Sequence, residues 1–481
     1  MKLMKHQVEA VQFAVDRGSC AFFHEVGVGK TLSALSTYSY LRSREPLHLL
    51  VICPLSLIEG AWIKEIEKFF PDMIWSDMHG GTTNARRFGV AVDVFLVNFE
   101  YLISEKKFES LKNLLSKGSW MCVIDESSKM KNNRSKTVER ILELRDFFRY
   151  RIIMSGTPAP NIEWEYWPQM YFLDPDILGD NFYKFKNIYF SLARGNQVLP
   201  GQFMNKAALR KMFEQGFKYE IVPEMREKMF ARMKPWCHYV KASDCLDLPD
   251  FVDEFRAIEM KPDQKRIYGQ MKTQYIAEIK RSIENELDPA REDFPSTWAV
   301  ANVALTKLLR LRQITSGFVR NDHNEDIGIA NENPKINELL SLVEECGHEQ
   351  MIIWCEFHWE IDQIVALLND HGVSQLHGRI KQEDRIDHLN DFLNKKNRFL
   401  IAHPDSAAHG LTLVNCHIQV FFSLSYSLEK YNQARGRIMR KGQERNCVYF
   451  HLICKGSIDE DILAILQEKA TAIQIAEKYL K

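Results

Sequence analysis

The residues with the clearest chemical potential lie near the amino end, in the segment from His24 to Thr31 (HEVGVGKT). An apolar run precedes this segment and a helical pattern follows it. Gly27 and Gly29 allow backbone amides to approach phosphate oxygens, and Lys30 supplies a compact positive charge for β- and γ-phosphates. The hydroxyl of Thr31 suits Mg²⁺, and the start of the helix adds partial positive charge. The segment predicts a nucleoside triphosphate site made of Gly27, Val28, Gly29, Lys30 and Thr31. The alternative is an ordinary strand–turn–helix with a chance GKT.

A second group of chemical residues follows the apolar run Met121–Ile124, where Asp125 and Glu126 are adjacent. A carboxylate at the end of a buried strand can hold Mg²⁺, usually through water, and a neighbouring carboxylate can orient and deprotonate an attacking water. Alone, such a pair often only caps the next helix. After a GKT loop in the same region, it predicts nucleotide hydrolysis, with Asp125 as metal ligand and Glu126 as catalytic base.

A third group lies near the carboxyl end, in the segment Gln433–Gln443 (QARGRIMRKGQ). Arg437 and Arg440 are three residues apart, so on a helix they share one face. Two guanidinium groups on one face could clamp a γ-phosphate bound by another domain. The charge pattern by itself favours a solvated basic helix or a patch that contacts nucleic-acid backbone.

Apolar runs alternate with helical patterns in the first 175 residues, and again from about residue 334. Apolar runs without alternation are typical of strands buried on both faces of a parallel sheet. The predicted strands are Cys20–Phe23, Leu47–Cys53, Val92–Val97, Met121–Ile124, Arg151–Met154, Met351–Cys355, Phe399–Ala402, Ile418–Ser423 and Val448–Ile453. Helical spacing between them, as in Thr31–Leu41 and Glu59–Phe70, completes the βαβ rhythm of a doubly wound α/β fold.

Residues 176–330 have a different pattern, mainly helical, as in Lys206–Gln215 and Thr297–Arg312. The turn-rich piece Asp244–Asp250 splits this region, and the polar stretch Asn331–Pro334 is a plausible boundary. We therefore predict an α/β domain over residues 1–175, helical insertions and a linker over 176–330, and a second α/β domain over 331–481 that ends in a terminal helix, Ile458–Leu480.

The 481 residues carry 63 basic and 64 acidic side chains, a formal charge of −1. This balance neither demands nor excludes a polyanionic partner, because a local basic groove can lie in a neutral protein. The ten cysteines contain no C-x-x-C pair, and no apolar segment is long enough for a signal peptide or a membrane span. These features predict a reduced, cytoplasmic protein without a membrane partner. Basic residues at 206–234 could touch DNA phosphates, or form a solvated face.

Taken in order, these segments resemble the motifs of the superfamily-two helicases, specifically the SWI/SNF-type branch of DNA-dependent ATPases. The resemblance covers nearly all of the chain. The matching residues are Gln7, GVGKT (27–31), ICPLSL (52–57) with Trp62, DESS (125–128) with KMKN (129–132), SGTP (155–158) with Asn161, Trp354, Phe357, LHG (376–378), HGLTL (409–413), Gln433, Gly436, Arg437, Arg440, Gly442 and Gln443. Several motifs in the correct order are more specific than any one of them.

The resemblance implies two RecA-like doubly wound parallel-sheet lobes with helical insertions, and ATP and Mg²⁺ bound between the lobes. Gln7 would read the adenine from the first lobe. Arg437 and Arg440 would act as catalytic residues from the second lobe, so that hydrolysis requires closure. Nucleic acid that bridges both lobes would favour closure and stimulate hydrolysis. The residues implied to couple the nucleotide to the nucleic acid are Ser155, Thr157, Gly410 and Gln433.

Three positions depart from the family's pattern. Ser127 and Ser128 stand where the family usually has Ala-His, and that His normally links the nucleotide site to the interface between lobes. His24 replaces an acidic residue common in this branch. Ala407 and Ala408 stand where a double glycine usually begins the motif at His409. The first departure leaves the coupling in question, but not magnesium binding.

The predicted function is that of an ATP-dependent DNA translocase or helicase, which moves on duplex DNA with little sequence specificity. Branched or single-stranded DNA are further candidate substrates. We expect a minimal, monomeric motor without accessory domains, recruited by a partner or by DNA structure. The preference for DNA rests on the helical insertions and on the segments Leu308–Gln313 and Arg435–Gln443. Two alternatives remain open: a nucleotide-gated DNA-binding module with slow hydrolysis, and an RNA helicase.

Overall fold

The computed structural model describes residues 2–84, 92–194, 197–199, 212, 217–286, 297–321, 323–329, 332–407 and 411–480. The chain forms two compact units: unit 1 contains Met1–Asp247 and Lys469–Lys481, and unit 2 contains Leu248–Glu468. The division falls inside the turn-rich piece Asp244–Asp250. The boundaries near residues 175 and 331 remain a prediction about domains. Helix α15 (Pro334–Glu345), which begins at the predicted boundary, lies within unit 2.

Unit 1 is built on a seven-stranded sheet in which every paired neighbour is parallel. The strand order is β10-β1-β6-β5-β2-β4-β3. The strands are β1 (Ser19–His24), β2 (His48–Cys53), β3 (Trp75–Asp77), β4 (Val94–Asn98), β5 (Trp120–Asp125), β6 (Phe148–Met154) and β10 (Cys237–Val240). Because parallel neighbours need crossover connections, helices separate the strands along the chain.

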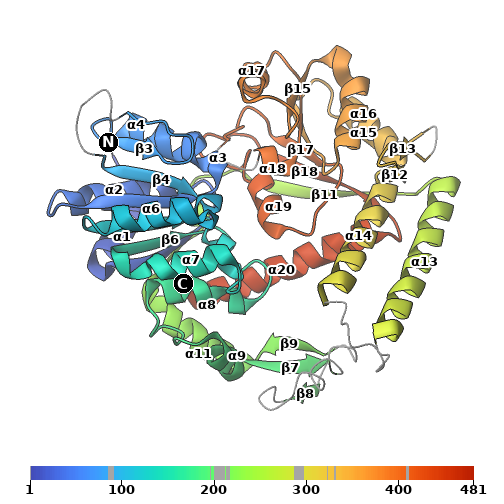
Figure 1. Cartoon of the computed structure of the whole chain (residues 1–481). Coiled ribbons are helices and arrows are strands. Elements are labelled where there is room, and N and C mark those ends of the chain that lie inside the picture. Colours follow the sequence, from blue (N-terminus) through green and yellow to red (C-terminus); the bar gives the residue numbers. More distant parts are fainter. Residues whose placement is uncertain are drawn as a thin grey trace. The chain divides into compact units, whose positions relative to one another are not determined.

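Helices cover both faces of this sheet (Figure 1), and a hydrophobic core lies against each face. Successive residues of a strand point to opposite faces, so Cys20 and Phe22 enter one core while Ala21 and Phe23 enter the other. The first core includes residues of α1 (Lys5–Arg17), α2 (Lys30–Arg42) and α4 (Lys64–Phe69). The second includes residues of α6 (Glu105–Leu115), α7 (Lys136–Leu144), α8 (Tyr166–Leu173), α9 (Phe182–Tyr189) and α11 (Pro223–Met233).

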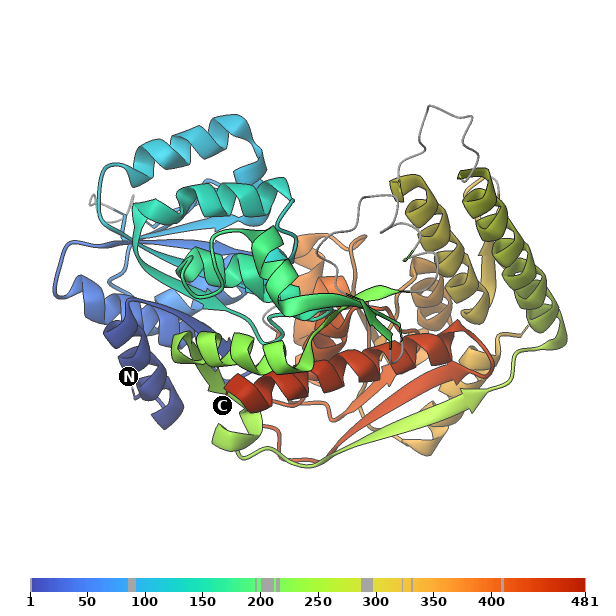
Figure 2. The ribbon, with the colours of Figure 1, turned by 90° about the horizontal axis from the view of Figure 1, so that it is seen from below.

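Unit 2 contains a six-stranded sheet, again parallel throughout, in the order β11-β18-β17-β14-β16-β15. Its strands are β11 (Phe251–Ile258), β14 (Met351–Trp354), β15 (Val373–Leu376), β16 (Phe399–Ala402), β17 (Ile418–Phe421) and β18 (Cys447–Cys454). Figure 2 shows the two long strands β11 and β18 side by side. The helices of unit 2 include α13 (Pro262–Glu286), α14 (Thr297–Thr315), α16 (His358–Leu368), α17 (Gln382–Leu393), α18 (Pro404–Ala407) and α19 (Leu428–Arg435). Helix α20 (Ile458–Leu480) begins in unit 2, and its residues from Lys469 onward belong to unit 1.

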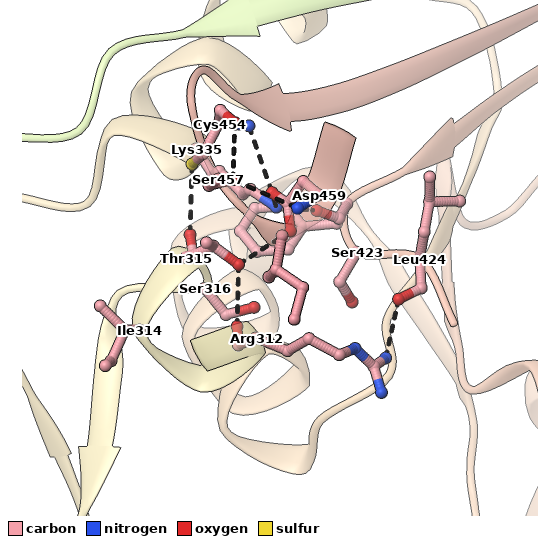
Figure 3. A network of polar contacts seen from close by, with 12 residues as sticks. Arg312, Ile314, Thr315, Ser316, Lys335, Ser423, Leu424, Cys454, Ser457 and Asp459 are labelled. Carbon is pink, nitrogen blue, oxygen red and sulfur yellow. Dashed lines mark hydrogen bonds and ion pairs between the residues drawn. The ribbon is translucent and has the colours of Figure 1, made fainter. Parts of the chain in front are cut away.

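A buried ion pair connects three helices of unit 2 (Figure 3). The ammonium of Lys335, in α15, is fully buried and lies 2.8 Å from a carboxylate oxygen of Asp459 in α20. The hydroxyl of Thr315, at the end of α14, donates to the other oxygen of Asp459 at 2.9 Å. Burial is the largest single influence on the pKa of Lys335 and lowers it, but Asp459, Cys454 and Glu360 together outweigh burial, and the pKa is raised. A buried charge that has its partner is tolerated, so the pair holds α14, α15 and α20 together.

Every apolar run predicted as a strand overlaps an observed strand, and the predicted α/β fold with two parallel-sheet lobes is confirmed. The middle region contains more strand than we predicted. Strand β10 completes the sheet of unit 1, and β11 completes that of unit 2. Both are edge strands, and β11 keeps Phe251 and Val252 exposed, so neither has the continuous apolar pattern of a strand buried on both faces.

The remaining strands in this region of unit 1 form a small antiparallel sheet. It consists of β7 (Phe190–Arg194), β8 (Gln197–Leu199) and β9 (Lys218–Ile221). The predicted helix Lys206–Gln215 lies almost entirely outside the described residues, as do Lys206, Arg210 and Lys211 of the basic group. No helix in the described parts of the chain is both long and apolar enough to cross a bilayer.

Candidate active site

The glycine loop connects β1 to α2 in unit 1. Gly27 and Gly29 both adopt positive φ angles, 91° and 82°. Gly29 caps the start of α2. A Cβ atom at Gly29 would lie only 2.4 Å from the side-chain nitrogen of Gln7. Both the backbone angle and this close approach therefore require glycine at position 29. This is the geometry that an approaching phosphate group needs.

The side chain of Gln7 lies directly against this loop, and its role in reading the adenine stays a prediction. Its side chain is buried, its nitrogen donates to the carbonyl of Val28 at 3.4 Å, and its oxygen accepts from the amide of Met4 at 3.0 Å. The ring of His6 makes a second contact to the same carbonyl, with Nε2 at 2.9 Å. Two consecutive side chains of helix α1, His6 and Gln7, thus contact the loop at the carbonyl of Val28.

The ammonium of Lys30 lies across the loop that precedes it. Its Nζ donates to the carbonyls of His24 and Glu25, at 2.9 and 3.3 Å. Its charge also acts on Asp125, because it opposes the rise of that carboxyl's pKa. Thr31 is the second residue of α2. The Lys30 side chain therefore forms hydrogen bonds within the loop and also acts electrostatically on Asp125 at the end of β5.

His24 is the residue of the loop that departs from the family's pattern. Its side chain contacts the neighbouring strand β10. Its Nε2 lies 2.8 Å from Nδ1 of His238 on the neighbouring strand β10. Burial, followed by the nearby charges of His238 and Lys30, lowers the pKa of His24 well below its usual value. The residue is neutral and packs on Phe22, and only its carbonyl takes part in the loop, as the acceptor for Lys30.

The ends of three neighbouring strands lie level with one another. Phe22 of β1 pairs with Met154 of β6, and Met154 pairs with Asp125 of β5. The residues that follow these strands therefore meet at the carboxyl edge of the sheet, where open α/β sheets bind ligands. The register brings together the glycine loop, Asp125 with Glu126, and the segment that starts at Ser155.

Glu126 has a left-handed backbone conformation, with φ 56° and ψ 55°. A residue with a Cβ atom rarely adopts this conformation, which costs about 1–3 kcal/mol and persists only where the surroundings impose it. Such residues cluster at active sites. The strained turn lies directly at the end of β5, between Asp125 and the short helix Ser127–Lys131.

Asp125 is held by two donors. The indole nitrogen of Trp62 donates to one oxygen at 3.0 Å, and the amide of Glu126 donates to the other at 3.0 Å. Burial raises the pKa of Asp125, while Lys30 and these hydrogen bonds oppose the rise. A second carboxyl lies close enough to affect it: burial, and then Asp125, raise the pKa of Glu65 to about 7.

The donor set around Asp125 fits Mg²⁺. Near Asp125, one oxygen of Glu65 is buried and has no hydrogen-bond partner among the described residues. No group of three or more histidine, cysteine or acidic ligands occurs in the described part of the chain. Mg²⁺ does not need one, because it keeps several waters and takes one or two carboxylates plus phosphate oxygens. Asp125 and the hydroxyl of Thr31 would be its protein ligands.

The role of Trp62 was missed by sequence reasoning, and it yields a prediction. Trp62→Phe removes the indole donor, so we expect the Mg²⁺ concentration for half-maximal ATP hydrolysis to rise by about 5-fold, the equivalent of one hydrogen bond of about 1 kcal/mol. Trp120→Phe is the matched control, because Trp120 is equally buried and its indole nitrogen has no partner among the described residues. A magnesium titration that gives the same midpoint for both variants would refute the role.

The segment after β6 lies against the glycine loop. The amide of Ser155 donates to the carbonyl of Phe22 at 3.2 Å, and the hydroxyl of Ser155 accepts from the amide of Thr157 at 3.1 Å. A Cβ atom at Gly156 would lie 3.4 Å from the carbonyl of His24 and 3.5 Å from the side chain of Val26. Ser155 and Thr157 thus belong to a segment that contacts the glycine loop, and their coupling role stays a prediction.

In unit 2, the two predicted catalytic arginines lie beside the segment that follows residue 410. Arg437 donates from Nε to the carbonyl of Gln433 at 2.9 Å and from Nη1 to the carbonyl of Leu411 at 3.1 Å. Arg440 donates from Nη1 to the hydroxyl of Thr412 at 3.3 Å. Burial lowers the pKa of Arg440 to about 10. Gly410 lies outside the described residues.

Two other arginines that we associated with DNA have internal partners. Arg312 donates to Glu356 at 3.1 Å and to the carbonyl of Leu424 at 2.8 Å. Arg435 forms a bidentate ion pair with Asp253 of β11, and its guanidinium carbon lies 4.1 Å from the ring centre of Tyr449. Both side chains hold elements of unit 2 together, so they are poor candidates for phosphate contacts.

A parallel sheet, a glycine loop that opens a helix and a strained Asp-Glu turn at the same edge define a P-loop protein of the helicase type. The chain belongs to the SNF2-related family: it matches the SNF2-related domain over residues 6–315, more than half of its length. The helicase conserved C-terminal domain matches residues 334–442. The predicted resemblance to the SWI/SNF-type branch is confirmed.

Among the relatives, protein p41 of Acyrthosiphon pisum secondary endosymbiont phage 1 is 25% identical, with 91% of this chain and 90% of that protein covered. The chromatin structure-remodeling complex subunit snf21 of Schizosaccharomyces pombe is 24% identical over 97% of this chain, but the match covers only 38% of that subunit. A solved structure of the Sulfolobus solfataricus SWI2/SNF2 ATPase core in complex with dsDNA is 22% identical, with a TM-score of 0.42 and coverage of 98% of this chain and 92% of that one.

Proposed function

We propose that this protein hydrolyses ATP to ADP and phosphate, and uses the reaction to move along duplex DNA with little sequence specificity. The observation that carries the proposal is the level register of β1, β6 and β5, which brings the glycine loop, Ser155 and the Asp125–Glu126 turn to one edge. Membership of the SNF2-related family supports the choice of ATP and DNA. The name of the yeast relative, a subunit of a chromatin structure-remodeling complex, supports duplex DNA further.

In the proposed reaction, the amides between Gly27 and Lys30 bind the phosphates, and the Lys30 ammonium balances charge on the β- and γ-phosphates. The oxygen of a water molecule attacks the γ-phosphorus, and Glu126 accepts the proton that this water loses. The bond between the γ-phosphorus and the oxygen of the leaving ADP breaks. Mg²⁺, when bound by Asp125 and Thr31, supplies positive charge at the β- and γ-oxygens. Arg437 and Arg440, which belong to unit 2, would stabilise the charge of the transition state.

The experiment is a comparison of phosphate release without nucleic acid and with single-stranded DNA, duplex DNA, forked DNA or RNA. We expect duplex DNA to raise turnover by ~10-fold or more, a usual coupling between two sites. Glu126→Gln should bind ATP but release phosphate ~10²–10⁴-fold more slowly, because the general base is lost.

Each alternative gives its own result in this comparison. Larger stimulation by RNA than by duplex DNA indicates an RNA helicase. DNA retention that depends on ATP, with almost no phosphate release, indicates a nucleotide-gated binding module. Displacement of a third strand from a triplex separates movement along duplex DNA from stimulation alone, and its absence would contradict translocation.

A further inference from the structure

Ser127, the residue directly after the two carboxylates, makes a contact that its position in the sequence does not reveal. Its hydroxyl donates to the side-chain oxygen of Gln169 at 2.7 Å. Both side chains are completely buried. Gln169 lies in α8, 42 positions further along the chain. A hydrogen bond between two fully buried polar side chains fixes their relative positions closely, because neither has water as an alternative partner.

The same amide of Gln169 reaches the segment after β6. Its nitrogen donates to the carbonyl of Pro158 at 2.6 Å and to the carbonyl of Glu165 at 2.9 Å. Pro158 follows Thr157, whose amide donates to the hydroxyl of Ser155. One side chain thus connects the turn at Glu126 to the loop that contains the predicted coupling residues.

We propose that Ser127 and Gln169 are positioning residues that couple the Asp125–Glu126 turn to the Ser155–Pro158 loop. The inference rests on the proposed function, and it assigns to this chain a physical link at the site where the usual Ala-His pair is replaced. Glu126 stays in its left-handed conformation only while its surroundings hold it there, and Ser127 is its immediate neighbour. When the nucleotide changes the turn, the Gln169 amide passes the displacement to the loop.

The neighbouring residue provides a matched control. Ser128 lies in the same short helix, Ser127–Lys131, and is equally buried. Its hydroxyl has no hydrogen-bond partner among the described residues. Ser127→Ala and Ser128→Ala therefore remove the same atom from the same environment, but only the first breaks the connection to Gln169.

The test uses the full chain with Ser127→Ala, Gln169→Leu, the double variant and Ser128→Ala. Three quantities are measured: turnover with and without duplex DNA, affinity for a fluorescent ATP analogue, and the temperature of unfolding. We expect Ser127→Ala and Gln169→Leu each to reduce the stimulation by DNA by ~10-fold, with little change in nucleotide affinity. The double variant should lose no more DNA stimulation than either single variant, because Ser127 and Gln169 act through the same hydrogen bond. Ser128→Ala should behave as the wild type.

Stability separates coupling from simple packing. Ser127→Ala leaves the side-chain oxygen of Gln169 unpaired, whereas the double variant removes the donor to the carbonyls of Pro158 and Glu165, so the double variant should unfold at no higher temperature than Ser127→Ala. If the loss of DNA stimulation in the four variants only follows their loss of unfolding temperature, the role is only structural and the inference is overturned. Equal stimulation of Ser127→Ala and Ser128→Ala overturns it as well. A wild-type protein without DNA stimulation overturns the proposed function itself, and this inference with it.

Discussion

Replacement of Lys30 by alanine is expected to lower the rate of ATP hydrolysis by about 10²–10³-fold, the usual effect of removing one preorganised charge from a phosphoryl-transfer site. Lys30 is the cation that the loop holds in place, through the carbonyls of His24 and Glu25. Its charge also opposes the rise in the pKa of Asp125 that burial causes. The variant therefore loses phosphate binding and, in addition, makes the predicted magnesium ligand easier to protonate.

Steady-state phosphate release and binding of a fluorescent ATP analogue check this prediction. We expect both turnover and nucleotide affinity to fall, because Lys30 acts on the bound triphosphate before and during the reaction. Lys5→Ala is the control, since Lys5 is a surface residue of α1 with only an exposed pair to Glu9. Unchanged turnover in Lys30→Ala would mean that the glycine loop does not hold the reacting phosphates.

Arg437→Gln should have an even larger effect on turnover, about 10³–10⁵-fold, the contribution of an arginine that stabilises charge on a transferring phosphoryl group. Nucleotide affinity should change little, because the loop and Lys30 belong to unit 1 and are intact. The expected pattern for Arg437→Gln is thus a loss of kcat without loss of binding, whereas Lys30→Ala should lose both.

Arg445→Ala is the matched control for Arg437. Arg445 is an exposed arginine of the same unit, paired with Glu349 at the surface, and such pairs contribute little to stability. Because Arg437 is buried against the carbonyls of Gln433 and Leu411, its variant must also be shown to unfold at a temperature near that of the wild type. Wild-type turnover in a folded Arg437→Gln protein would contradict an arginine finger at this position.

The strands and the glycine loop could be predicted because their signals are local. An uninterrupted apolar run such as Met121–Ile124 is enough to indicate a strand buried on both faces, and GVGKT combines two positive-φ glycines with a cation within a few residues. The strands β10 and β11 gave no such signal. Their places at sheet edges depend on which distant strands they pair with, β1 and β18.

Charge alone was a poor guide to the arginines. Arg312 and Arg435 have the same residue type and similar surroundings in the sequence as Arg437 and Arg440, yet Glu356 and Asp253 neutralise them within unit 2. These acidic partners lie 44 and 182 positions away. No local pattern distinguishes a cation that will be paired inside the fold from one that will meet a ligand.

The sequence by itself determined the two parallel sheets, the family and the residue types of the site, because apolar periodicity and motif spacing are properties of neighbouring residues. Only the tertiary structure decided how these residues act together. The level register of β1, β6 and β5 brings their ends to one edge, Trp62 holds Asp125 from 63 positions away, and Gln169 joins Ser127 to Pro158. Such contacts join distant segments, and their geometry is set by the close packing of the cores.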